Sequence, residues 1–357
     1  MHMADALLSP AVGGVMWAAS AGVAAYSIKK IQDDMDEKKI PLMGVMGAFV
    51  FAAQMINFSI PGTGSSGHIG GGMLLAILLG PHAGFLTMAS ILMIQALFFG
   101  DGGLLALGSN LFNLGFYTCF IAYPLIYKWF TRKGLTPKRI FTASMLSALI
   151  GLQLGSFSVV LETVMSGKTE LPFRTFVLLM QPIHLAIGVV EGLVTAAVVT
   201  FVWQARPEIL EKTSAGEALG SISIKKVITR LAIGVVLVGG GLSWFASSNP
   251  DGLEWSMFKT AGTTELKASD GIHRTLANIQ SKTAFLPDYG FKKAKSSNPG
   301  AEAAETTEAL PAVNAGTSIS GIVGGVLTLA LAAFTGLAIS RVKKRKKRIS
   351  PKSVEAR

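Results

Sequence analysis

The chain has 357 residues, of which 50% are hydrophobic and 15% are charged, and its mean hydropathy is +0.50. Soluble domains carry about 25% charged residues, so this composition favours a membrane protein over a soluble one. The one cysteine, Cys119, excludes a disulfide within the chain and a metal site built from several of its thiolates. The net charge of +11 is gathered between apolar stretches, which is typical of membrane topology rather than of nucleic-acid binding.

Apolar stretches predict an all-α, polytopic transmembrane bundle. A transmembrane helix needs about 20 mostly apolar residues, and we expect about seven core helices and two C-terminal ones. The nine expected crossings lie near residues 7–28, 40–57, 69–80, 82–99, 104–127, 140–165, 174–203, 226–246 and 318–340.

Basic segments set the expected orientation. Loop 29–39, segment 128–139 and tail 341–348 are rich in lysine and arginine, and such segments stay on the cytoplasmic side. Nine crossings then place the N-terminus outside the cytoplasm and the C-terminus inside it, in a bacterial inner membrane. The stretch 69–80 is short, and we accept it because an even number of crossings must separate two cytoplasmic loops.

The crossings divide the chain into units. The expected units are a metal-capturing core (1–204), a cytoplasmic linker (205–225), a two-helix accessory module (226–346) and a basic cytoplasmic tail (347–357). Residues 247–317 of the module are expected to be external and poorly patterned, with flexibility around 294–316. The sequence contains no Walker motif, so ATP hydrolysis would need a separate chain.

The dipeptide Met1-His2 can chelate a metal. Methionine aminopeptidases generally act when the second residue is small, so Met1 should remain with a free α-amine. The amine, the His2 backbone nitrogen and the His2 Nδ1 would close five- and six-membered rings around one ion. Three nitrogens leave one corner of a square open, and square-planar nitrogen sites are diagnostic of Ni2+ or Cu2+. The alternative is a histidine at position 2 by chance.

His68 offers a fourth nitrogen. It lies in PGTGSSGHIGGG (61–72), a loop that the expected topology puts on the same side as Met1. Irregular backbone at membrane depth is tolerated only where it is buried in protein or lines a cavity. Ser66 in this loop and Asn57 before it are candidates for holding a ligand imidazole in place. The alternative is that His68 is a polar loop residue facing water.

The other histidines have weaker claims. We expect His82 in a surface turn on the cytoplasmic side and His273 exposed in the external segment. His184 and Glu191 are seven residues apart on one helical face. Ionisable residues inside a membrane are usually functional and paired, so these two either lock helices together, which we favour, or lie on the ion path.

Several motifs together resemble the CbiM/NikM family, the substrate-capture components of nickel and cobalt energy-coupling-factor transporters. The resemblance covers roughly residues 1–204, and NPDGLEW (249–255) resembles the small accessory subunit of such systems, fused here to the main one. This segment favours the nickel branch. The core motifs are MH at the start, LLSP (7–10), NFSIPGTGSSGHIGGG, LLAILLGP, QALFFGDGGLLALGSN (95–110) and PIHLAIGVVEG (182–192).

The resemblance implies a ligand set and partners. The metal would be held by the Met1 amine, the amide and imidazole of His2, and His68. Ni2+ or Co2+ would be the transported substrate, and the partners would be a transmembrane coupling protein and two cytoplasmic ATPases. The small residues Ala18, Ala21, Gly22 and Ala25 would suit packing against such a partner, but we expect them to pack within the chain.

The chain departs from the family in two places. It reads Met3-Ala4-Asp5-Ala6 where Ile-Pro-Glu/Asp-Gly is common, and it has His82 where an aromatic residue is common. The first departure can alter how the N-terminal strand enters the site. Neither departure affects a proposed ligand.

Two other classes of function were weighed against transport by a binding subunit. A stand-alone permease or channel for divalent cations would need polar residues along a conducting path, and only Glu162 and Glu191 provide acids within the helices. A metal-dependent hydrolase would need an open coordination position, which a square of four nitrogens does not offer. We therefore expect no enzymatic activity in this chain.

Overall fold

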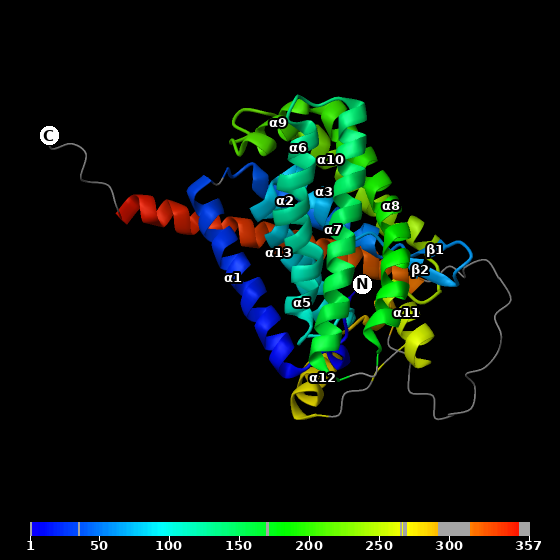
Figure 1. Cartoon of the computed structure of the whole chain (residues 1–357). Coiled ribbons are helices and arrows are strands. Elements are labelled where there is room, and N and C mark those ends of the chain that lie inside the picture. Colours follow the sequence, from blue (N-terminus) through cyan, green and yellow to red (C-terminus); the bar gives the residue numbers. More distant parts are fainter. Residues whose placement is uncertain are drawn as a thin grey trace.

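The computed structural model describes residues 2–34, 36–168, 171–264, 266, 270–291 and 315–349. Within this part of the chain most residues are helical, and one antiparallel hairpin is the sole β structure (Figure 1). The expected all-α helical bundle is therefore confirmed.

The elements follow the apolar stretches of the sequence. Short 3-10 turns occupy Asp5–Leu7, Leu242–Phe245 and Pro287–Tyr289, and wider π-type helix occupies Gln95–Phe99 and Phe112–Tyr127. The α-helices and strands are α1 (Pro10–Asp34), α2 (Lys39–Gln54), β1 (Phe58–Ile60), β2 (Ser65–Gly67), α3 (Gly72–Leu79), α4 (Pro81–Ile94), α5 (Leu107–Leu111), α6 (Lys128–Thr131), α7 (Pro137–Ser166), α8 (Phe173–Ala205), α9 (Pro207–Ala215), α10 (Lys225–Gly240), α11 (Gly252–Ala261), α12 (Gly271–Thr283) and α13 (Ala315–Ile349).

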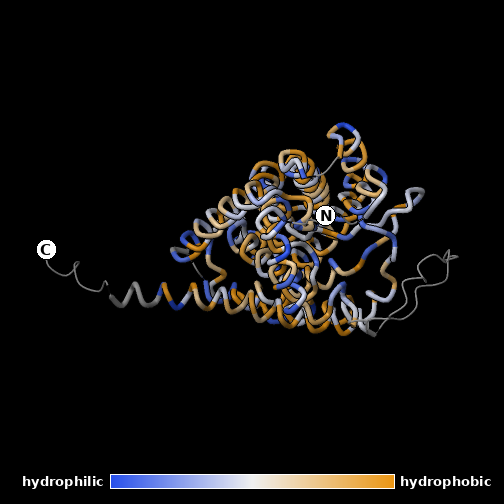
Figure 2. The backbone as a smooth tube through the Cα atoms, turned by 90° about the horizontal axis from the view of Figure 1, so that it is seen from below, coloured by the Kyte–Doolittle hydropathy of each residue, from blue (hydrophilic) through white to orange (hydrophobic). Residues whose placement is uncertain are grey.

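Long apolar helices indicate a membrane protein. A helix overlaps each of the nine expected crossings, and hydrophobic residues dominate the helices in Figure 2. The number of crossings and the orientation of the two ends stay predictions. Five helices of the described chain are long and apolar enough to cross a membrane, namely Pro10–Gln32, Pro81–Phe99, Pro137–Ser166, Phe173–Ala205 and Gly316–Lys343.

Helix α3 explains why the third expected crossing is short. Its eight residues are all buried. At about 1.5 Å per residue they span only ~12 Å, whereas the hydrocarbon core of a bilayer is ~30 Å thick. The preceding residues 68–71 are non-helical and mostly buried. Irregular backbone inside the protein therefore makes up part of the segment that is expected to be the third crossing.

The C-terminal helices pack on the core. Helix α7 lies along α8, and α13 packs against α2, α4 and α10. In Figure 1, α11 and α12 lie at one end of the bundle and α9 lies at the opposite end. The accessory module thus contributes both a core-facing helix and a structured cap.

Residues 247–317, which the sequence predicts to be poorly patterned, contain the helices α11 and α12. Helix α11 opens with a capping box, in which the Asp251 side chain accepts two backbone N–H groups and Glu254 accepts the Asp251 N–H. The Asp270 side chain caps α12. The prediction is therefore wrong for these two helices, because side-chain caps leave no trace in hydropathy. The flexibility expected around 294–316 falls outside the described residues, except that residues 315 and 316 begin α13.

Helix α1 turns its small residues outward. Ala18, Ala21, Gly22 and Ala25 are all exposed, whereas Ser20 is buried and donates to the Gly108 carbonyl at 2.6 Å. The prediction that these small residues pack within the chain is therefore wrong. The core contacts the other side of α1, which leaves the small-residue face open to lipid or to another protein.

Gly324 of α13 tests the packing of the accessory module. A Cβ at Gly324 would lie 2.1 Å from Cζ of Phe51 and 2.9 Å from Cζ of Phe99, whereas a Cβ at Gly325 would have no neighbour nearer than 3.4 Å. We expect Gly324→Ala to lower the free energy of unfolding by about 1–3 kcal/mol, the usual cost of overpacking. Gly325→Ala is the matched control, since both changes improve helix propensity equally. Thermal unfolding of the detergent-purified protein measures the difference, and equal midpoints for the two variants would contradict this account.

Candidate metal-binding site

The N-terminal segment enters the interior of the bundle. Met3 is fully buried, and its N–H donates to Oδ1 of Asn110 at 2.7 Å while its carbonyl accepts from Nδ2 of the same side chain at 3.2 Å. The Gly103 N–H donates to the same carbonyl at 2.9 Å. These bonds fix the chain next to His2. Met1 lies outside the described residues.

The loop that receives this segment requires glycine. A Cβ at Gly103 would lie 1.8 Å from Oδ1 of Asp5 and 2.4 Å from its backbone nitrogen, so no side chain fits there. Oδ1 of Asp5 accepts the N–H of Ala106 at 3.0 Å. Gly103 therefore allows the two backbones to lie against each other.

His68 follows directly after the hairpin of β1 and β2. Ser59 and Ser66 are opposite each other in this hairpin. Nδ1 of His68 lies 3.0 Å from the carbonyl oxygen of Ile69. With the proton on Nδ1, this contact leaves the lone pair of Nε2 available, which is the usual arrangement of a metal-ligating histidine.

Buried side chains from two helices satisfy the backbone after His68. The two carboxylate oxygens of Glu191, in α8, accept the N–H groups of Gly70 at 2.9 Å and Gly71 at 3.0 Å. Gln54, in α2, donates to the Gly70 carbonyl at 2.7 Å. Glu191 therefore holds the His68 loop against the bundle.

The rings of His2 and His68 stack on each other. Their centroids lie 5.1 Å apart and their planes are inclined by 17°. Burial lowers the pKa of His2, and burial together with the neighbouring His2 lowers the pKa of His68 to about 4. A lowered pKa favours the neutral form of each imidazole, which is the form that binds a metal.

Asp101 faces His2 from the glycine-rich loop. Its Oδ1 lies 3.3 Å from Nδ1 of His2, and its Oδ2 accepts the hydroxyl group of Tyr289. Asp288 and Tyr289 adopt positive φ angles of 50° and 56°, which non-glycine residues rarely do and which often marks a functional position. Tyr289 also stacks on Phe99, with centroids 5.0 Å apart. No local pattern in the sequence predicts the pairing of Asp101 with Tyr289, because 188 residues separate the two.

The NPDGLEW segment is tied to the His68 hairpin. The Ser66 N–H donates to the Pro250 carbonyl at 2.8 Å, and Oγ of Ser66 donates to the Asn249 carbonyl at 2.7 Å. The indole N–H of Trp255 donates to the Thr63 carbonyl at 3.0 Å. The bonds of Ser66 therefore join the hairpin to the accessory module.

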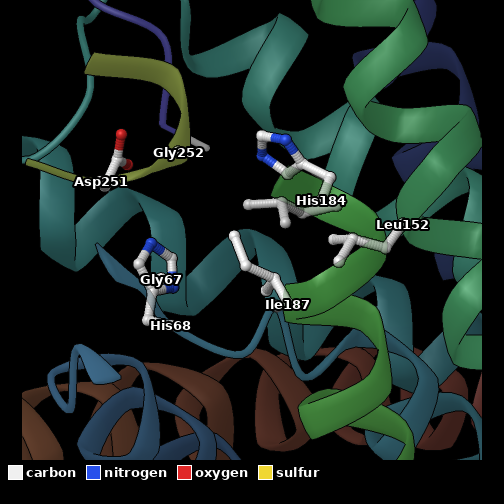
Figure 3. Close-up of a pocket in the computed structure, with 9 residues that line it drawn as sticks. Gly67, His68, Leu152, His184, Ile187, Asp251 and Gly252 are labelled. Atoms are coloured by element: carbon white, nitrogen blue, oxygen red, sulfur yellow. The ribbon is translucent and has the colours of Figure 1, made fainter. Parts of the chain in front are cut away.

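His184 lines a small cavity together with His68 and Asp251. The cavity has a volume of about 10 Å³, close to the space of one water molecule, and Ile187 lies between the two histidines in Figure 3. Nδ1 of His184 lies 2.8 Å from the Met180 carbonyl of the same helix, and its Nε2 is buried with no partner among the described residues. No described hydrogen bond joins His184 to Glu191, although the two share a helical face.

A larger cavity opens beside the stacked rings. It has a volume of about 640 Å³, and its lining includes His2, His68 and Asn57 as well as residues of α11 and α12. Oδ1 of Asn57 is buried and has no partner among the described residues. The Asn57 carbonyl accepts the Ser247 N–H at 2.6 Å. Asn57 thus connects the cavity wall to the accessory module.

His273 is buried rather than exposed. Its side chain contacts Asp270, and its Nε2 lies 2.9 Å from the carbonyl oxygens of both Asp5 and Leu8. The residue is only 3% exposed, so the prediction of an exposed histidine is wrong. Helix α12 instead contacts the N-terminal segment through the His273 side chain.

His82 lies away from the stacked pair. It is in the first turn of α4, half-buried between the rings of Tyr26 and Phe120, each with its centroid 5.4 Å away. The prediction of a surface turn is therefore wrong, since His82 lies at the start of a helix and its ring packs against two aromatic side chains. A side chain with a ring fits this position because it packs between these two aromatic rings.

Comparisons with known proteins identify the family. The family model described as cobalt uptake substrate-specific transmembrane region matches residues 2–209, and the PDGLE domain model matches residues 225–341. A protein of Archaeoglobus fulgidus named as a fused nickel transport protein NikMN is 31% identical over 341 residues, which cover 96% of this chain and 98% of the relative. A fused nickel transport protein NikMN of Rhodobacter capsulatus is 31% identical over 223 residues, covering 59% of this chain and 64% of the relative.

A solved structure supports the same assignment. The crystal structure of a truncated transition metal transporter matches with a TM-score of 0.51 and 31% sequence identity, covering 57% of this chain and 99% of that chain. The family model spans more than half of the chain, and the relative from Archaeoglobus fulgidus spans nearly all of it. The chain therefore belongs to the CbiM family of nickel and cobalt transport proteins, and its C-terminal part carries a PDGLE domain.

Proposed function

We propose that this chain captures Ni2+, or alternatively Co2+, as the substrate-binding component of an ATP-driven energy-coupling-factor importer. The observation that carries the proposal is the stacking of His2 on His68, with ring centroids 5.1 Å apart, beside a cavity that both residues line. Membership of a nickel and cobalt transport family supports the choice of cargo. Catalysis is not part of the role, and ATP hydrolysis would take place in partner chains.

Four nitrogens are proposed to bind the ion. They are the Met1 amine, the His2 backbone nitrogen, Nδ1 of His2 and Nε2 of His68, in a square-planar arrangement that suits Ni2+. Among the described residues, no group of three or more His, Cys, Asp or Glu side chains could hold a metal ion. This finding supports a site that uses backbone nitrogen as well as imidazole.

Asp101 has a proposed role in metal entry. Its Oδ1 lies 3.3 Å from Nδ1 of His2, the atom that would bind the ion. To bind there, the ion must replace the proton that Nδ1 directs at Asp101, and this proton can leave through the carboxylate or move to Nε2. The carboxylate would remain close enough to offset part of the positive charge of the metal.

Four further residues are proposed to support the ligands. Glu191 holds the loop after His68, and Ser66 ties the hairpin before it to the accessory module. Asn57 presents a buried oxygen at the cavity wall. His184 supports the small cavity behind His68, with its Nδ1 held by its own helix.

The proposed assembly assigns a role to each unit. Residues 1–204 form the capturing core, 205–225 a cytoplasmic linker, 226–346 the accessory module and 347–357 a cytoplasmic tail, with the N-terminus outside. The exposed small-residue face of α1 is proposed to pack against a transmembrane coupling protein. Two cytoplasmic ATPases would complete the importer.

The metal content and optical spectrum of the purified full-length protein test the site. We expect one Ni2+ per chain and the spectrum of diamagnetic, square-planar Ni(II). A paramagnetic octahedral spectrum would contradict the four-nitrogen square. Nickel uptake by cells that lack the coupling and ATPase subunits would instead support the alternative function of a stand-alone permease or channel.

Replacement of His68 tests the fourth ligand. We expect His68→Ala to lower nickel uptake by at least about 10–100-fold, the range found even for residues that only support a ligand. His82→Ala is the control, because His82 lies away from the stacked rings. Radiolabelled nickel uptake, normalised to the amount of protein in the membrane, gives the comparison. Uptake at the parental rate by His68→Ala would show that His68 is not a ligand.

An added N-terminal residue tests the other three ligands. One residue before Met1 converts the terminal amine into an amide and moves His2 to position three, so the proposed chelate cannot form. We expect this extension to abolish nickel uptake, and His2→Ala to match it in severity. A C-terminal tag of the same size is the control and should leave uptake intact. Normal transport by the extended protein would show that Met1 is not a ligand.

A further inference from the structure

The large cavity beside His2 and His68 is lined by acidic side chains. Asp5, Asp101, Asp251, Glu254 and Asp288 all contribute to its lining, and we call these five residues and the 640 Å³ space that they border the acidic vestibule. The described lining residues include no lysine or arginine. This uniform sign of charge is unusual in a chain with a net charge of +11.

We propose that the acidic vestibule collects hydrated divalent cations from the exterior and delivers them to the His2–His68 pair, and that the accessory module provides most of its charge. The inference rests on the proposed capture of nickel or cobalt, and it adds an entry route to that site. A cleft lined by one sign of charge concentrates the opposite charge and raises association rates by about 10–10³-fold. A divalent cation responds twice as strongly as a monovalent one.

The accessory module supplies three of the five acids. Asp251 and Glu254 belong to the start of α11, and Asp288 belongs to the turn that follows α12. Helix α12 is fastened to the core, because the Gln280 side chain donates to the carbonyls of Ala96 at 2.9 Å and Gly102 at 2.7 Å, and the turn is held by the bond from Tyr289 to Asp101. The vestibule is therefore incomplete without the C-terminal part of the chain.

The acids are arranged to attract an ion without trapping it. Oδ1 of Asp251 accepts the N–H groups of Leu253 at 2.8 Å and Glu254 at 2.9 Å, and Oε2 of Glu254 accepts the Asp251 N–H at 3.0 Å. Asp101 is similarly engaged by Tyr289. These oxygens are already directed at donors. No three of the described acids and histidines form a group that could chelate a metal.

A proposed ligand residue lines the acidic vestibule. The His2 side chain is only 4% exposed, and its Nδ1, the proposed ligand atom, faces Oδ1 of Asp101 at 3.3 Å. The other ring nitrogen, Nε2, is buried with no hydrogen-bond partner among the described residues, and such atoms are commonly satisfied by a water or an ion. An acidic surface alone would not show where the cation binds, but the His2 imidazole provides a binding group.

The test is the rate of Ni2+ binding to the full chain in nanodiscs. The double variant Glu254→Gln with Asp288→Asn removes two charges with little change of shape. Glutamine can replace glutamate in a capping box, and asparagine tolerates the left-handed conformation of residue 288. Stopped-flow transfer of Ni2+ from a chromogenic chelator gives the association rate, and equilibrium dialysis gives the stoichiometry.

We expect the double variant to bind Ni2+ about tenfold more slowly at low ionic strength, with the same stoichiometry and dissociation rate as the parent. In about 1 M salt, where the Debye length is ~3 Å, the two rates should converge. Glu217→Gln, which removes one charge, is the control for total charge, since Glu217 is an exposed acid outside the vestibule, and it should bind at the parental rate.

The outcomes separate the two proposals. A double variant that loads at the parental rate in low salt, or a parental rate that does not fall as salt is added, would overturn the acidic vestibule alone. An equal slowing by Glu217→Gln would do the same, because it would reflect total charge. A parent that binds no Ni2+ would overturn the proposed function and the vestibule with it.

Discussion

Peptide groups that leave a helix inside a membrane protein must find partners within the protein, and this constraint shapes the whole site. Both histidines lie on non-helical chain in the interior of the bundle. One side-chain amide, that of Asn110, pairs with both the N–H and the carbonyl of Met3, much as a neighbouring strand would. One carboxylate, that of Glu191, takes two consecutive N–H groups after His68. Without these two side chains the segments would leave backbone groups unpaired at a cost of several kcal/mol each.

The same constraint explains how the accessory module is joined to the core. The hairpin edge at Ser66 and the carbonyl of Asn57 are backbone groups that the core leaves open, and the segment around NPDGLEW supplies their partners. The accessory module also supplies a partner to the N-terminal segment, because His273 of α12 contacts the carbonyls of Asp5 and Leu8. The module therefore completes the hydrogen bonding of the two segments that carry the histidines. Because both units are fused in one chain, these hydrogen bonds form within one molecule and do not depend on the protein concentration.

Local patterns in the sequence predicted the helices and the two histidines. Hydropathy is read over windows of about 20 residues, and the chelating geometry of Met1-His2 involves adjacent residues only. The side chains that hold the segments around these histidines come from far along the chain, and no local pattern marks Asn110 as one of them. The burial of His273 escapes sequence patterns for a related reason, since segment 247–317 is polar and its helices depend on caps at Asp251 and Asp270. Pairings across 107 residues, such as Met3 with Asn110, leave no periodic signal.

In the proposed arrangement, attraction and selection of the metal belong to different residues. Carboxylates attract every divalent cation, including the hard ions Mg2+ and Ca2+ that prefer oxygen ligands. Nitrogen ligands, of which only the backbone amide becomes charged, by losing its proton as the metal binds, exert little long-range attraction, but their planar geometry favours Ni2+. If acids were also the ligands, the abundant hard ions would compete for the site. Acids that are already committed to N–H and hydroxyl donors avoid this competition, because they retain charge but have no convergent oxygens to offer. The bonds of Asp251 to the start of α11 and of Asp101 to Tyr289 thus serve selectivity as well as folding.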